Sequence, residues 1–331
     1  MTTGKAEATA LRVVNPLPRA LHHYQRELAG LLDSFDDVTW LQQAVGSAEI
    51  GGQSRVQKLL AATKHIRTLR SINGPFIGVW PALGHLEAFG VTGPSGAIIH
   101  HDPVPIRRQI GYGDLSVRAS VLQANRVGMT AIAHSRAAEQ RLRDFGYAAV
   151  TAVPHPILPP THRRIDVARP VRVLGQFKPA RDLDLLRTLG PRLRREGLET
   201  EIVGRGWPTI AGWNVRDEFV EEAQLTDLIG TSSAIVIPYR RYWQSGIAIR
   251  AFESAVPVVG TSGGFLDELY GGDLSLLVGP DASTEEWVGR IRDASVAGED
   301  YVTERAREYY ADGRLKWRRL IDSLSDRAEP S

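Results

Sequence analysis

Short apolar runs alternate with amphipathic stretches along nearly the whole chain. We expect the apolar runs to form strands at 10–14, 75–80, 96–100, 129–134, 148–154, 171–177, 199–204, 233–238, 256–260 and 274–279. Between them, segments such as 22–35, 136–146 and 181–197 repeat apolar residues with the period of a helix. Alternation of strands and helices predicts parallel sheets with right-handed crossovers.

The Pro- and Arg-rich segment 154–170 interrupts this alternation midway along the chain. Each side of it holds enough strand–helix units for a doubly wound domain. The pattern therefore predicts an α/β protein with two Rossmann-like domains, residues 1–160 and 161–312. A last helix, 313–327, either packs back onto the first domain or stays on the second.

The amino-acid composition limits the classes of protein to which the chain can belong. Among 331 residues, 43% are hydrophobic and 24% are charged, as in soluble globular proteins, and the absence of cysteine excludes disulfides and Cys-ligated zinc. A net charge of +2 without a long basic run argues against nucleic-acid binding. The polar N-terminus and the lack of a stretch of roughly 20 apolar residues suggest a cytoplasmic protein.

Three junctions between a strand and a helix in the second half are candidate phosphate sites. In the first, Lys178 and Arg181 follow the strand that ends at Gly175 and precede a helix. A helix N-terminus presents unpaired N–H groups and partial positive charge, so added cations would suit a diphosphate. Both could equally be solvated loop charges.

The second and third junctions are rich in small residues. Tyr239 to Trp243 follow a strand and would form one wall of a pocket, and Gln244, Ser245 and Gly246 then turn into a helix. Gly246 would be required either because ligand occupies the space of a Cβ atom or because its φ is positive. Gly263 and Gly264 open the next helix, where backbone N–H groups could face a ligand.

In the first half, His100, His101 and Asp102 end a strand, and prolines follow. A His and an Asp at this place could orient a substrate hydroxyl or move a proton, although Asp102 could simply begin an Asx turn. No spacing of His, Asp or Glu indicates a metal site. The chain also lacks the GxSxG, Walker and GxGxxG patterns, which disfavours hydrolase, NTPase and dinucleotide-binding functions.

The helix expected at 54–70 has several apolar residues on one side and basic residues elsewhere, with no acidic residue. Such a helix could lie on an anionic membrane, or pack on its own sheet with a solvated basic face.

The order of these motifs resembles that of GT-B glycosyltransferases, specifically the retaining family-four type. IIHHDPVP is similar to the family's His-Asp-x-x-Pro loop, GQFKPARDLDLL to its diphosphate-binding loop, and PYRRYWQSG and PVVGTSGGFLDEL to its later donor-site segments. The resemblance covers nearly the whole chain. It implies two domains facing across a cleft, and it implies that Lys178, Arg181 and helix N-termini neutralise a leaving diphosphate without metal or other cofactor.

The sequence departs from that family at its paired glutamates. Counting back from Pro257 places Tyr242 and Arg250 there, and Glu253 lies one helical turn beyond Arg250, where it could serve the ribose. The usual Gly-Gly of the first loop is also missing.

The resemblance implies transfer of a sugar from a nucleoside-diphosphate sugar to a hydroxyl acceptor, with retention. His101 and Asp102 would position the sugar, and the donor phosphate would take the acceptor's proton. The acceptor would be lipid-linked if 54–70 contacts the inner face of the membrane. Two alternatives are a nucleotide-sugar epimerase on the same fold and a sugar-nucleotide-binding subunit that has lost catalysis.

Overall fold

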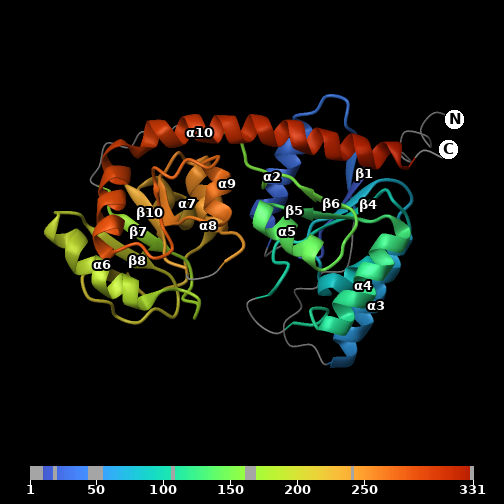
Figure 1. Cartoon of the computed structure of the whole chain (residues 1–331), viewed down its shortest axis with the longest axis horizontal. Coiled ribbons are helices and arrows are strands. Elements are labelled where there is room, and N and C mark those ends of the chain that lie inside the picture. Colours follow the sequence, from blue (N-terminus) through green and yellow to red (C-terminus); the bar gives the residue numbers. More distant parts are fainter. Residues whose placement is uncertain are drawn as a thin grey trace. The chain divides into compact units, whose positions relative to one another are not determined.

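A computed structural model describes residues 10–17, 21–43, 55–105, 109–160, 169–239 and 242–328. The chain divides into two compact units (Figure 1): residues 1–156 together with 312–331 form unit 1, and residues 157–311 form unit 2. The division between residues 311 and 312 falls inside the long helix α10 (Thr284–Asp326).

Unit 1 contains a six-stranded parallel sheet in the order β2-β1-β3-β4-β5-β6. Its strands are β1 (Leu11–Val14), β2 (Trp40–Gln43), β3 (Phe76–Gly78), β4 (Gly96–Ile99), β5 (Thr130–Ala133) and β6 (Val150–Ala152). Strand order reverses between β1 and β3, because the chain first moves outward to β2 and then returns past β1.

Helices cover both faces of this sheet. The right-handed crossover rule places α2 (His22–Asp33) on one face and α3 (Arg55–Arg70), η1 (Gly84–Gly90), α4 (Asp114–Val127) and α5 (Arg136–Asp144) on the other. The face under α2 is completed by the end of α10, whose apolar side chains join the same buried cluster. That cluster includes Leu28, Leu31, Leu32, Ile77, Ile99, Trp317, Leu320, Ile321 and Leu324.

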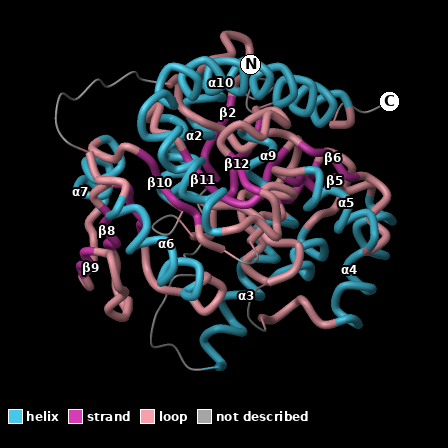
Figure 2. The backbone as a smooth tube through the Cα atoms, turned by 60° about the vertical axis from the view of Figure 1, so that its left-hand side comes forward, coloured by secondary structure: helices cyan, strands magenta, loops and turns pink. Residues whose placement is uncertain are grey.

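Unit 2 repeats the plan with a sheet in the order β12-β11-β10-β7-β8-β9. Its strands are β7 (Val171–Leu174), β8 (Thr200–Val203), β9 (Asn214–Arg216), β10 (Ala234–Ile237), β11 (Val258–Thr261) and β12 (Leu277–Val278). Its helices are α6 (Leu183–Arg195), α7 (Glu222–Gly230), α8 (Gly246–Glu253), α9 (Phe265–Leu269) and the first part of α10. Figure 2 shows the strands of both units enclosed by helices.

The predicted fold class is confirmed, with two doubly wound parallel sheets. All ten expected strands are present, most of them shorter than predicted. Strands β2 and β9 were not predicted. Both lie at sheet edges and none of their residues is fully buried, so they lack the apolar run by which the other strands were recognised.

Candidate functional site

In unit 2 the strand order reverses between β7 and β10, which are neighbours in the sheet. Ligands of open α/β sheets bind beyond the carboxyl ends of the strands at such a reversal. The loop after β7 carries Lys178 and Arg181, and the segment after β10 carries Tyr239, Gln244 and Ser245. The structure therefore brings these two predicted segments together, and an isolated β-bridge joins Arg181 to Tyr239.

Arg181 is a buried cation, only 5% exposed. Its guanidinium lies 4.8 Å from the ring centre of Trp207 and 4.9 Å from that of Tyr239. Nη2 donates to the carbonyl oxygen of Leu174 at 2.8 Å, whereas buried Nε has no hydrogen-bond partner among the described residues. No acidic side chain in the described part of the chain forms an ion pair with it, and burial lowers its pKa.

Gly175 lies close to both the guanidinium of Arg181 and the start of α8. Its φ is +94°, and a Cβ atom there would lie 3.1 Å from Nη2 of Arg181 and 3.9 Å from Cγ1 of Ile247. Because Ile247 is the second residue of α8, Arg181 and this helix N-terminus border the same small space. Lys178 lies on the same loop with an exposed side chain.

The α8 N-terminus is built as expected, with one exception. Ser245 is the N-cap, and its hydroxyl accepts a hydrogen bond from the backbone N–H of Ala248 at 3.3 Å. Gly246 does not have a positive φ, so that explanation for this glycine is wrong. A Cβ atom on Gly246 would meet nothing within 4 Å, which leaves its open side as the remaining explanation. Gln244 is half-buried.

One of the two glycines before α9 already donates its backbone N–H to a residue of the same chain. Gly263 has a φ of +88°, and its N–H donates to Oδ2 of Asp267 at 2.9 Å. This N–H is therefore already bonded to a carboxylate of the same turn. Beside Gly264 there is open space.

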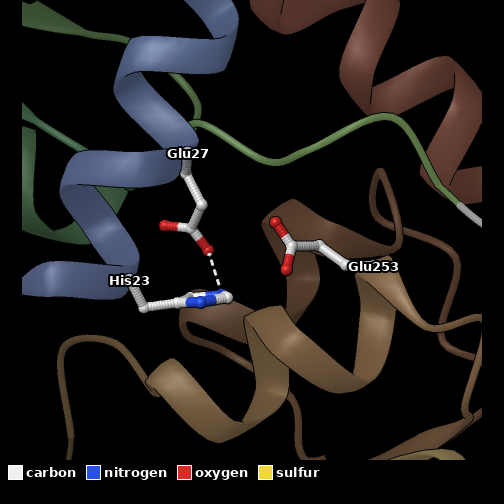
Figure 3. A group of neighbouring side chains, drawn as sticks. All are labelled: His23, Glu27 and Glu253. Atoms are coloured by element: carbon white, nitrogen blue, oxygen red, sulfur yellow. Dashed lines mark ion pairs between the residues drawn. The ribbon is translucent and has the colours of Figure 1, made fainter. Parts of the chain in front are cut away.

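Arg250 and Glu253 both make contacts within unit 2. The guanidinium of Arg250 pairs with Glu222 at 3.0 Å and donates to the hydroxyl of Thr226 at 2.7 Å, which joins α8 to α7. Glu253 (Figure 3) lies at the end of α8, and its Oε1 accepts from the backbone N–H of Leu158 at 2.7 Å. Both side chains therefore hold neighbouring segments of this unit in place.

In unit 1, His101 lies in an aromatic cluster beside the reversal between β1 and β3. Nε2 of His101 is 2.8 Å from the carbonyl oxygen of Val79. Since a carbonyl only accepts, Nε2 of His101 carries a proton. The ring stacks on Trp80 at 5.0 Å and meets the edge of Tyr24 at 4.7 Å. The adjacent His100 packs instead against His85.

Two further histidines complete this cluster. The hydroxyl of Tyr24 lies 3.0 Å from Nε2 of His134, whose Nδ1 lies 3.0 Å from the carbonyl oxygen of Val153. Burial holds the pKa of His134 well below its ordinary value and lowers that of His155 to about 3. Both imidazoles are therefore neutral, and His134 accepts a hydrogen bond from Tyr24. Asp102, next to His101, is half-buried.

A buried carboxylate lies on α2 in the same unit. Figure 3 shows Glu27 with His23 one helical turn earlier, and Nε2 of His23 is 2.8 Å from Oε1 of Glu27. The other carboxylate oxygen is 3.6 Å from Nδ1 of His155. Arg26 donates to Nδ1 of His23 at 2.9 Å, so the proton of a neutral His23 ring lies on the nitrogen that faces Glu27.

Sequence reasoning missed Trp207, Tyr24 and His134. Trp207 follows the Gly-Arg-Gly turn after β8, a position comparable to the predicted phosphate loops, and that turn was the available signal. Tyr24 sits at an apolar position of an amphipathic helix, and nothing in the local sequence distinguishes it from a core residue.

No protein-family model matches the sequence, and no curated protein is significantly similar to it. Several solved structures are similar over nearly the whole chain. HepE from Anabaena in complex with UDP and glucose has a TM-score of 0.60 at 13% identity, over 96% of this chain and 98% of that one. The chain has the GT-B fold.

Two synthases show the same similarity of fold. A trehalose-6-phosphate synthase has a TM-score of 0.61 at 10% identity, covering 95% of this chain and 98% of its own. The sucrose-phosphate synthase of Thermosynechococcus elongatus has a TM-score of 0.61 at 12% identity, covering 96% and 98%. At these identities the similarity establishes the architecture of the chain.

Proposed function

We propose that this protein transfers a sugar from a nucleoside-diphosphate sugar to a hydroxyl acceptor. The observation that carries the proposal is the buried guanidinium of Arg181 at the strand-order reversal of unit 2. A buried charge is costly unless an opposite charge or hydrogen bonds compensate it. Arg181 donates to one carbonyl, shares a side-chain hydrogen bond with Tyr239 and has two aromatic neighbours, which leaves its remaining donors for an anionic ligand.

The surroundings of Arg181 favour a diphosphate as that anion. The α8 N-terminus borders the same space, with Ser245 as cap and open space beside Gly246. Helix N-termini and arginine both bind phosphate oxygens well, and exposed Lys178 adds a mobile cation. One protein of similar fold is a complex with UDP and glucose, and two others are sugar-phosphate synthases, which supports a nucleotide-sugar donor.

In the proposed reaction the bond between the sugar's anomeric carbon and the diphosphate breaks, and a bond to the acceptor oxygen forms on the same face. The acceptor's proton passes to the departing phosphate. Arg181, Lys178 and the α8 N-terminus stabilise the developing negative charge, so no metal is required. His101 and Asp102 orient hydroxyl groups of the sugar. The acceptor would be lipid-linked if residues 54–70 contact the inner face of a membrane.

Calorimetric titration of the intact chain with UDP, GDP, ADP and uridine tests donor binding. We expect one nucleoside diphosphate to bind and the bare nucleoside to bind far more weakly. A turnover assay with the matching nucleotide sugar then separates the alternatives. Sugar interconversion without acceptor would indicate an epimerase, a function that the similar structures described above do not favour. Binding without turnover on any acceptor would indicate a non-catalytic subunit, and failure of all three diphosphates to bind would contradict the proposal.

A further inference from the structure

Exposed apolar side chains gather on one helical layer of unit 1. Of the nine large hydrophobic residues that are exposed in the described part of the chain, four lie on α3, on α4 or just before α4. They are Leu60, Ile110, Leu115 and Leu122, with 63%, 74%, 82% and 72% of their surface exposed. We call these four residues, with the basic residues named below, the α3–α4 face. Burying such residues would be favourable, so they mark a surface suited to a partner.

On α4 the exposed leucines share one stripe with arginines. Leu115, Arg118, Leu122 and Arg126 are three or four residues apart, which places them along one side of the helix, and all four are exposed. The opposite side, which includes Val117, Val121 and Ala124, is buried, and α4 packs against η1. After Asp114 in its first turn, α4 contains no acidic residue.

Helix α3 continues the basic character but supplies less apolar surface than the sequence suggested. Lys64 and Arg67 are exposed, and the helix contains no acidic residue. Leu69, expected on the apolar side that would face lipid, is 1% exposed and packs against η1 near Gly90. We therefore place the centre of the membrane contact on α4 rather than on 54–70. Leu60, Lys64 and Arg67 of α3 lie beside it.

The two helices belong to the same layer of unit 1. Helices α3 and α4 both follow the carboxyl ends of strands, β2 and β4, and both pack on η1, on the same face of the sheet. Leu60 in the second turn of α3, Ile110 just before α4 and Leu115 in its first turn thus lie on the side of the layer nearer the carboxyl ends of the strands, and Leu122 lies further along α4. No helix in the described part of the chain has the length and hydrophobicity needed to cross a bilayer.

We propose that the α3–α4 face docks on the surface of a membrane rich in anionic lipids. Leucine and isoleucine side chains would enter the interfacial region, while Lys64, Arg67, Arg118 and Arg126 would contact lipid phosphates. The positive charge of this face favours a lipid surface over a protein partner. A protein partner would need a matching acidic surface, whereas anionic lipid supplies negative charge at every point. Docking would bring the proposed lipid-linked acceptor to unit 1, but docking itself does not depend on the proposed sugar transfer.

Flotation of the intact protein with vesicles tests this inference. We expect binding to vesicles of phosphatidylglycerol and phosphatidylcholine, weakened by salt, and little binding to phosphatidylcholine alone. Arg118→Gln and Arg126→Gln should each lower the vesicle affinity about fivefold, the effect of one basic residue at an anionic surface. Leu115→Gln with Leu122→Gln should lower affinity at every salt concentration, because these changes remove the apolar part of the contact.

Matched controls come from α10 in the same unit. Leu315 is 62% exposed and Arg319 is exposed, so Leu315→Gln and Arg319→Gln make the same chemical changes elsewhere and should leave vesicle affinity unchanged. All variants should keep the circular dichroism spectrum and nucleotide binding of the wild type. Equal binding to neutral vesicles, no binding to either kind, or equal losses in the α10 controls would overturn the proposal. If the wild type does not bind nucleotide, that result would instead count against the proposed function.

Discussion

Arg181 holds a positive charge where the folded protein itself supplies little to balance it. Its aromatic neighbours Trp207 and Tyr239, a hydrogen bond with the side chain of Tyr239 and one carbonyl contact stabilise the charge only in part. We therefore expect Arg181→Met, which keeps the apolar contacts, to leave the free energy of unfolding unchanged or to raise it, because a buried charge disappears. The same change should weaken binding of the nucleoside diphosphate by about 1.5–3 kcal/mol. Urea unfolding and calorimetry measure the two effects.

Lys178→Ala serves as the comparison for Arg181→Met. Lys178 is exposed on the same loop, so its loss should weaken nucleotide binding without raising stability. If Arg181→Met bound nucleotide as the wild type does, the buried cation would be a structural feature and the donor site would lie elsewhere.

The buried histidines of unit 1 lead us to predict how the free energy of unfolding depends on pH. Burial lowers the pKa of His155 to about 3, from a value near 6.5 in the unfolded chain. Between these values only the unfolded chain binds the proton, so stability is fully present above about pH 6.5 and falls as the pH decreases. Each such histidine contributes up to about 1.4 kcal/mol per pH unit to this slope. His155→Gln should therefore make the free energy of unfolding less dependent on pH between about 5 and 6.5.

The matched variant is His22→Gln, which removes an exposed histidine from the start of α2. Carboxylates that contact neither histidine titrate alike in both variants, so their contribution cancels in the comparison of slopes. The same slope in His155→Gln as in the wild type would mean that His155 takes up its proton equally in the folded and unfolded chain, and would contradict the lowered pKa.

At the scale of elements, a substitution at Gly246 tests whether α8 forms part of the candidate donor site. Gly246 has open space beside it and an ordinary φ, so valine fits the backbone without strain. We expect Gly246→Val to retain the melting temperature within a few degrees and to lose most nucleotide affinity, because its side chain would occupy the space next to the α8 N-terminus. Gly279 has equally open surroundings, and Gly279→Val should alter neither property. A Gly246→Val variant that folds and binds nucleotide normally would place the donor away from α8.

Sequence patterns identified the elements that carry strong local signals. The ten expected strands were found from their apolar runs, and the loop of Lys178 and Arg181 from its place between a strand and a helix. Edge strands β2 and β9 were missed because none of their residues is fully buried, so they lack a continuous apolar run. Two aromatic neighbours, Trp207 beside Arg181 and Tyr24 beside His101, were missed for a different reason. Both approach these residues only through tertiary packing, and in the sequence Tyr24 looks like a core position.

At the scale of the whole molecule, the last turns of α10 complete the core of unit 1 although they lie at the other end of the chain. Trp317 is fully buried in the cluster with Leu28, Leu31 and Leu32, and its Nε1 donates to the carbonyl oxygen of Pro154 at 2.8 Å. Arg318 pairs with Asp37, and Arg314 donates to the carbonyl oxygen of Ser34 at 2.7 Å. These contacts join residues that are hundreds of positions apart in the sequence.

Trp317→Ala should therefore destabilise unit 1 by about 3–5 kcal/mol, the usual cost of removing a buried tryptophan side chain. Leu315→Ala, two residues earlier and exposed, should change the free energy of unfolding by less than about 0.5 kcal/mol. Hydrogen exchange read out by peptide should show faster exchange in α2, β1 and β3 of the Trp317→Ala variant, while β7, β8 and β10 of unit 2 keep the protection of the wild type. Nucleotide binding, measured where the variant is still folded, should be retained because the candidate donor site lies in unit 2. If protection fell equally in both sheets, the C-terminal turns would stabilise the chain as one cooperative body, and their effect could not be assigned to the core of unit 1.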